Sequence, residues 1–217
     1  MQLASLLINY LAKENNVTVP VCVTPDECFA LYRELIGSAD PSRLNAAYLK
    51  SEENYLKSRL ADIGITNLDG FSYKLSVSEI PAYRLSADML VNPVGDIMDD
   101  LYLYGGSRLK AVCMNIEKDT VTSGFALDYK GIFSTPSPKI QNRLTSDNVA
   151  QTRRIYNAAA DCAVKNNVKS IVFLPIITGN KLMNQQVLKI AAETVAARDD
   201  LKDVKKVFSV NVNGEIK

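Results

Sequence analysis

Apolar residues in the first sixty positions recur at intervals of three and four, which is the spacing of one face of an α-helix. The first predicted helix has an apolar face made of Leu3, Leu6, Leu7, Tyr10 and Leu11. A second helix is predicted to begin after Thr24 as its N-cap and to end at Gly37, and a third spans about residues 41–60. Helices this short predict an N-terminal helical extension, residues 1–70, that packs on a larger core.

The pattern changes after residue 70 to short apolar stretches that are separated by longer helical segments. Strands are predicted at 71–75, 87–91, 131–134, 168–174 and 204–210. Helices at 147–166 and 184–197 separate the last three of these strands. The apolar run at 168–174 is typical of a strand that is buried on both faces. This order predicts a second unit, residues 71–217, built as an α/β sandwich with largely parallel central strands.

The overall composition is that of a globular protein, and it excludes some partners. The 217 residues are 47% hydrophobic and 23% charged, which is enough apolar content for one sizeable core with an appendage. The net charge of +1 provides no field that attracts nucleic acid or an anionic membrane. No apolar run approaches 18 residues, and the N-terminus lacks the basic start of a secretion signal. We therefore expect a cytoplasmic protein with no nucleic-acid or membrane partner.

The sequence contains no histidine, and this absence excludes whole classes of chemistry. Ser-His-Asp and Cys-His nucleophiles, histidine general bases and histidine-ligated metals all require an imidazole. The cysteines are few and unpatterned, which favours reduced thiols at Cys22, Cys28, Cys113 and Cys162. The first two are six positions apart, which is not the spacing of a zinc knuckle. We therefore predict no metal site and no cofactor.

The turn that follows the 168–174 strand has the residues of a phosphate-binding loop. Ligands of layered α/β domains gather beyond the carboxyl ends of the strands, where residues 175–180 are expected to lie. Gly179 permits close approach of the backbone, Thr178 offers a hydroxyl, and the next helix begins with unpaired N–H groups. Turns with these residues also occur without a ligand, so the pattern alone leaves both interpretations open.

A strand, a loop, a helix and a final strand follow one another in the second half of the chain. The strand ends in Phe173-Leu174-Pro175, the loop is Ile176-Ile177-Thr178-Gly179, and the last helix and strand occupy 185–211. Before them come the segment ALDYKGIFSTPSP (126–138) and a helix that contains a tyrosine. In order and spacing these elements resemble the macrodomain family, whose members bind ADP-ribose. The resemblance implies a three-layer α/β/α sandwich with a mixed central sheet.

Three upstream segments extend this resemblance. Leu90-Val91-Asn92 is similar to the start of the family's Val-Asn-Ala-Ala-Asn turn, and Ser78-Glu79-Ile80 stands where the family has Gly-Asp-Ile. Gly105-Gly106-Ser107 is similar to the family's glycine loop. The helical extension and its Gly-Ile-Thr-Asn-Leu end (64–68) resemble the zinc-containing branch that hydrolyses protein-linked ADP-ribose. The resemblance therefore covers nearly the whole chain.

The departures from the family pattern gather at one place. Residues 92–96 read Asn-Pro-Val-Gly-Asp, so Gly95 replaces the second Asn, which contacts the distal ribose in the family. The zinc-containing branch binds its metal with Cys and His just after this turn, whereas residues 96–109 contain neither. The segment 107–137 has room for only about two helical turns, where the family places a long helix. The side of the cleft that would hold the scissile bond is therefore rebuilt.

The resemblance implies a role for each matching residue. Glu79 would accept a hydrogen bond from the adenine amino group, and Gly105, Gly106, Thr178 and Gly179 would present N–H groups to the diphosphate. The full predicted ligand-binding set is Glu79, Ile80, Asn92, Gly105, Gly106, Ser107, Ile177, Thr178, Gly179 and Asn180. Two alternatives stay open: Glu79 as a solvated acid at a strand end, and Asn92 as a partner of the loop backbone.

The only catalytic candidates are the acids Asp96, Asp99 and Asp100. One of these carboxylates would act as a general base for water, or together they would hold a divalent metal, or they form a solvated loop. We therefore expect binding of ADP-ribose or ADP-ribosylated protein, with the hydrolytic side degenerate. The alternatives are an active zinc-independent hydrolase that uses these aspartates, and a protein-interaction module whose remnant cleft binds nothing.

Overall fold

The computed structural model describes residues 2–22, 24–95, 100–141 and 143–210. At its centre lies a sheet with the strand order β2-β7-β6-β3-β5-β4, and β1 pairs with β3 off this path. The strands are β1 Thr66–Asn67, β2 Ser76–Ser78, β3 Leu85–Val94, β4 Thr120–Thr122, β5 Tyr129–Pro136, β6 Ser170–Phe173 and β7 Lys205–Ser209. All pairs are parallel except β4 with β5, so the sheet is mixed. The predicted α/β fold class is confirmed.

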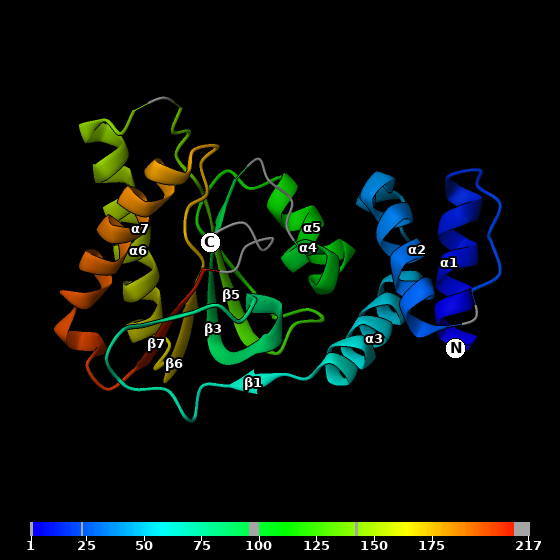
Figure 1. Ribbon diagram of the computed structural model, residues 1–217, viewed down its shortest axis with the longest axis horizontal. Helices are drawn as coiled ribbons and strands as arrows, with labels where there is room; N and C mark the ends of the chain where they lie inside the picture. The colour runs from blue at the N-terminus through cyan, green and yellow to red at the C-terminus, as the bar shows by residue number, and fades with distance from the viewer. Residues whose placement is uncertain (1, 23, 96–99, 142, 211–217) are drawn as a thin grey trace.

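Helices cover both faces of the sheet (Figure 1). On one side lie α6, Ser146–Lys165, and α7, Lys181–Ala196; on the other lie α4, Asp100–Gly105, and α5, Ser107–Met114. Successive side chains of β3 point to opposite faces, as strand geometry requires. Met89 and Val91 join the core beneath α6 and α7, whereas Leu90 joins the core on the α4 and α5 side. This alternation makes three layers, with β3 buried on both faces.

Three helices precede the sheet: α1, Gln2–Glu14; α2, Pro25–Ser38; and α3, Ala46–Ile63. They lie beyond α4 and α5, and α3 contacts both of these helices (Figure 1). Their buried residues join the core on the α4 and α5 side of the sheet without a break. Thr24 begins α2 with a complete capping box, in which its side chain accepts from the Glu27 N–H and Glu27 accepts from the Thr24 N–H.

Several boundaries differ from the sequence-based prediction. No strand forms at 71–75; β2 follows at Ser76–Ser78, where it pairs with β7. Helix α2 continues through Gly37, and the predicted third helix begins only at Ala46, after a short 3₁₀ turn at Pro41–Arg43. Leu6, predicted to face the core, is 67% exposed. Within the described part of the chain, no helix has the length and apolar character needed to cross a membrane.

Candidate functional site

The carboxyl ends of β6, β3 and β5 lie at one edge of the sheet, and a cavity of about 750 Å³ opens there. Its walls come from the end of β3 (94–95), the end of α5 (113–116), the segment after β5 (136–141) and the loop 177–179. We call this cavity the Thr-Gly cleft. Its position beyond the strand ends is where layered α/β domains bind their ligands. Of the predicted ligand-binding residues, Ile177, Thr178 and Gly179 line it.

Hydrogen bonds to α7 fix the Thr-Gly loop. The Asn184 side-chain oxygen accepts from the Thr178 N–H at 2.7 Å and from the Thr178 hydroxyl at 2.8 Å. Asn180 is the N-cap of α7, and its side chain accepts from the N–H groups of Leu182 and Met183. Sequence analysis missed Asn184; the signal was a polar side chain in the first helical turn after a Thr-Gly loop. The loop is therefore preorganised by its own helix.

These bonds also change which groups of the loop can bind a phosphate. The N–H of Thr178 was predicted to face a diphosphate, but it already donates to Asn184. Gly179 is exposed, and no hydrogen bond of its N–H to another described residue is recorded. A Cβ at this position would meet no atom within 4 Å. Of the two predicted N–H donors in this loop, Gly179 alone stays open to an anion.

The second predicted phosphate contact, the glycine loop, is occupied from within the protein. Gly106 donates its N–H to the Tyr102 carbonyl at 3.0 Å, and Gly105 packs on Leu109. The Glu52 carboxylate accepts from the Ser107 N–H at 2.9 Å and from its hydroxyl at 2.8 Å. Glu52 therefore takes the anion position at the N-terminus of α5, where the helix dipole favours negative charge. The N–H groups of Gly106 and Ser107 therefore already donate within the protein, and ligand binding by Gly105, Gly106 and Ser107 stays a prediction.

Glu52 itself was not predicted as a site residue. Its side chain is fully buried, and it also accepts from the Tyr32 hydroxyl at 2.7 Å and the Tyr48 hydroxyl at 3.4 Å. Burial raises the pKa of Glu52, although these hydrogen bonds act against the rise. A signal was available in the sequence, because Glu52 stands four residues after Tyr48 and three before Tyr55 and so shares one face of α3 with these two tyrosines. Through Glu52 the helical extension holds the helix that borders the cleft.

The remaining predicted contacts divide between the sheet and its edge. Asn92 is buried, and its amide nitrogen lies 3.4 Å from the Cys113 sulfur and 3.5 Å from the Ser134 hydroxyl. It therefore bonds side chains inside the fold, and the two predicted alternatives for Asn92, a ligand contact and a bond to the loop backbone, stay predictions. Glu79 is exposed at the end of β2, and Ile80 accepts from the Ser209 hydroxyl at 2.8 Å. Neither residue lines the Thr-Gly cleft.

Of the three acidic candidates, Asp96 and Asp99 lie outside the described residues. Asp100 begins α4, and its carboxylate pairs with the Arg33 guanidinium at 2.6 Å. This contact ties Asp100 to the helical extension. No group of three or more acidic or cysteine side chains that could hold a metal occurs in the described ranges. Within these ranges, no cysteine is joined to another in a disulfide.

Comparison with known proteins agrees with this fold. Residues 87–191 match the Macro domain family. A protein-ADP-ribose hydrolase from Treponema medium is 26% identical over 228 aligned positions, which cover 87% of this chain and 85% of that protein. A crystal structure of a Trypanosoma brucei macrodomain has a TM-score of 0.55 at 17% identity, and the match covers 85% of this chain and 88% of that one.

A second structure of a Trypanosoma brucei macrodomain was solved in complex with ADP-ribose. It has a TM-score of 0.50 at 14% identity, and the match covers 87% of this chain and 85% of that one. These structural likenesses confirm the macrodomain fold that the sequence predicted.

Proposed function

We propose that this chain, which carries a macrodomain over residues 87–191, binds ADP-ribose or a protein that bears it. One observation carries this proposal: the exposed Gly179 N–H stands on a loop fixed by Asn184, at the mouth of the Thr-Gly cleft. A backbone N–H held in this way can donate to a phosphate oxygen without a further cost of ordering the loop. The macrodomain from Trypanosoma brucei that was solved with ADP-ribose supports the choice of ligand.

ADP-ribose would lie along the edge formed by the strand ends. We assign the adenine to the side of Glu79 and Ile80, and the diphosphate to Gly179 with Thr178 and Asn180 as its support. The distal ribose would then lie near Val94 and Gly95. The strand order β2-β7-β6-β3 places these three points in sequence across the sheet. With about 4.8 Å between neighbouring strands, the span from β2 to β3 is about 14 Å.

Binding without hydrolysis is the activity that we propose. Cleavage at the distal ribose requires that the sugar is held in a reactive pose beside an activated water. Gly95 provides no side chain to hold the sugar. The Asp100 carboxylate accepts from the Arg33 guanidinium at 2.6 Å, which ties this acid to the helical extension. The partner in the cell would be an ADP-ribosylated protein of the cytoplasm.

Calorimetry and thermal denaturation with ADP-ribose test the proposed binding. We expect saturable binding of one ADP-ribose, and a melting temperature that rises by about 5–10 °C at a concentration of 100 times Kd. AMP is the matched control, because it lacks the second phosphate and the distal ribose, and it should shift the melting temperature less. Equal shifts with ADP-ribose, AMP and buffer would contradict the proposed function.

Hydrolysis of protein-linked ADP-ribose is the second candidate, since the Treponema medium relative is named a protein-ADP-ribose hydrolase. We expect release of ADP-ribose to be absent or very slow, at least about a hundredfold below an active hydrolase, because the distal ribose lacks its positioning group. The assay uses proteins modified on Asp or Glu, Ser or Arg, with and without Mg²⁺. Robust turnover that disappears in Asp96→Ala, Asp99→Ala or Asp100→Ala would replace binding with catalysis as the function.

A further inference from the structure

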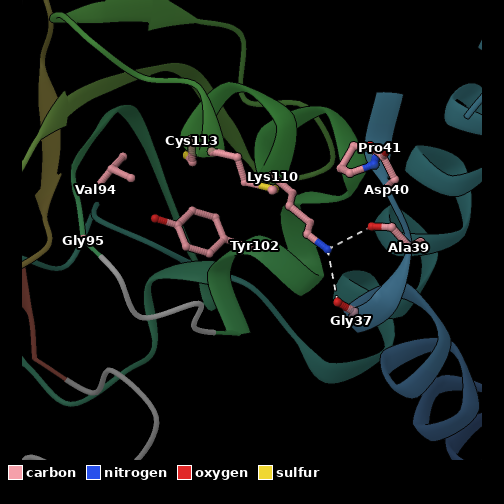
Figure 2. A pocket seen from close by; sticks show the side chains of 10 residues that line it. Gly37, Ala39, Asp40, Pro41, Val94, Gly95, Tyr102, Lys110 and Cys113 are labelled. Carbon is pink, nitrogen blue, oxygen red and sulfur yellow. Dashed lines mark hydrogen bonds between the residues drawn. The ribbon is translucent and has the colours of Figure 1, made fainter. Parts of the chain in front are cut away.

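A second cavity, of about 480 Å³, lies between the helical extension and the macrodomain (Figure 2). One wall is the segment from Gly37 to Pro41, which ends α2 and leads into the following turn. The opposite wall is formed by Tyr102 of α4 and by Lys110 of α5. The cavity therefore exists only because the extension packs beside these two helices.

Lys110 fixes the wall that the extension contributes. Figure 2 shows its side chain reaching from α5 to the end of α2, where its ammonium donates to backbone carbonyls. The acceptors are Ile36 at 3.0 Å, Ala39 at 3.2 Å and Gly37 at 3.4 Å. A cation at the C-terminus of a helix is also favoured by the helix dipole. These contacts hold the 37–41 wall in place before any ligand arrives.

The two cavities meet at the end of β3. Val94, Gly95, Cys113 and Met114 line both of them. Gly95 has no side chain, and a Cβ placed there would meet no atom within 4 Å. The two cavities therefore share one wall at the end of β3, to which Gly95 adds no side chain. A ligand whose phosphate lies at Gly179 would reach the second cavity across this wall.

We propose that the second cavity receives the modified amino acid and adjoining peptide of an ADP-ribosylated protein, and we call it the acceptor cavity. This inference rests on the proposed function. Protein-linked ADP-ribose is attached through its distal ribose, so the peptide leaves the ligand at the end that we assign to Val94 and Gly95. Ala39, Pro41 and Val94 offer apolar surface. The Asp40 Oδ1 already accepts from the Ser42 N–H and hydroxyl, so Asp40 would offer its Oδ2 to a peptide N–H. The helical extension thereby acts as a specificity element.

Gly37→Trp tests the acceptor cavity. Gly37 lines it, and a Cβ at this position would meet no atom within 4 Å, so the new side chain begins in open space. Tryptophan also has a higher helix propensity than the glycine it replaces in α2. The wild-type protein should bind a mono-ADP-ribosylated peptide about tenfold tighter than ADP-ribose, the gain expected from burying one side chain. Gly37→Trp should reduce this preference to less than about twofold and leave the affinity for ADP-ribose unchanged.

Two variants serve as matched controls for Gly37→Trp. Gly37→Ala adds only a methyl group and should keep the preference for the peptide conjugate. Gly70→Trp adds the same indole at a glycine that is equally open but lies outside both cavities, and it should also keep the preference. As a measurement on the wild-type protein, a peptide with a photoreactive residue beside the modified one should crosslink to residues 37–41 or to Tyr102.

The outcomes separate this inference from the proposed function. If ADP-ribose does not bind the wild-type protein, both are overturned. If ADP-ribose binds but the peptide conjugate binds no tighter, the acceptor cavity alone is overturned. A preference that survives in Gly37→Trp, or crosslinks that fall elsewhere, would also overturn it. Loss of ADP-ribose binding in Gly37→Trp would show that the two cavities do not act as separate subsites, which contradicts the inference.

Discussion

Replacing Glu52 with alanine should lower the free energy of unfolding by about 3–5 kcal/mol, the range for removing one partner of a buried charged network. The carboxylate is fully buried and joins three helices. It accepts from the Tyr32 hydroxyl of α2 and from the Ser107 N–H and hydroxyl at the start of α5, and it is itself part of α3. Alanine would leave these buried donors without an acceptor and would open a cavity among them.

Urea denaturation followed by circular dichroism measures this change. The urea concentration at the midpoint reports the change in stability when the dependence of the free energy of unfolding on urea concentration is the same in both proteins. In thermal denaturation, the same loss corresponds to a melting temperature about 6–20 °C lower. Glu52→Gln keeps the size of the side chain but turns an amide N–H toward a donor, so we expect a smaller loss of about 1–3 kcal/mol. Glu34→Ala on the exposed side of α2 is the control, and it should change stability by less than about 0.5 kcal/mol.

The pH dependence gives an independent check of the same group. Burial raises the pKa of Glu52 in the folded protein. An acid with a raised folded-state pKa contributes most stability below its unfolded value of about 4.3, and that contribution falls as the pH rises through the folded pKa. The stability difference between the wild-type protein and Glu52→Gln should therefore shrink as the pH increases from 4. A difference that grows with pH would mean that the network lowers the pKa of this carboxyl.

The parts of the fold that the sequence predicted depend on local signals. Thr24, Pro25 and Glu27 specify the start of α2 among themselves, because the capping box closes within four residues. The strand β6 and helix α7 were likewise found from an apolar run, a turn and a helical pattern that are contiguous in the chain. The Thr-Gly loop between them was placed correctly for the same reason, since its neighbours in sequence are its neighbours in space.

The parts that the sequence did not predict depend on contacts between distant residues. Glu52 and Ser107 are 55 positions apart, and nothing near either residue shows that they meet. The glycine loop therefore resembled a free phosphate site, although a carboxylate of the extension occupies it. Lys110 similarly finds its acceptors more than 70 positions away, at the end of α2. Strand β2 formed at 76–78 instead of 71–75 because its pairing with β7 outweighs the alternation of the preceding residues.

These two missed contacts bear on function because both join the extension to α5, the helix whose end borders the Thr-Gly cleft and the acceptor cavity. In this chain, internal groups take the positions that a ligand was predicted to take on the glycine-loop side. Under the proposed function, phosphate recognition would therefore rest on the opposite loop, 177–179. The effect of a substitution in that loop should be correspondingly large.

Gly179→Val should reduce the affinity for ADP-ribose at least about a hundredfold, which is about 3 kcal/mol. The valine side chain would occupy the space through which a phosphate oxygen reaches the Gly179 N–H. A hydrogen bond from a backbone N–H to a charged oxygen contributes about 1.5–3 kcal/mol, and displacement of the diphosphate would weaken its other contacts as well. Isothermal titration calorimetry of the wild-type protein and the variant measures the change.

The structure makes this substitution a clean test of the site. A Cβ at Gly179 would meet no atom within 4 Å, and its φ lies outside the left-handed region that favours glycine. The free energy of unfolding of the variant should therefore lie within about 0.5 kcal/mol of the wild-type value, as is usual for a surface substitution. Gly70→Val is the matched control, because Gly70 is equally open but lies away from the cleft, and it should bind ADP-ribose as the wild-type protein does. Equal affinities of Gly179→Val and the wild-type protein would place the diphosphate elsewhere, because the N–H groups of Thr178 and Asn180 on either side of Gly179 already donate within the protein.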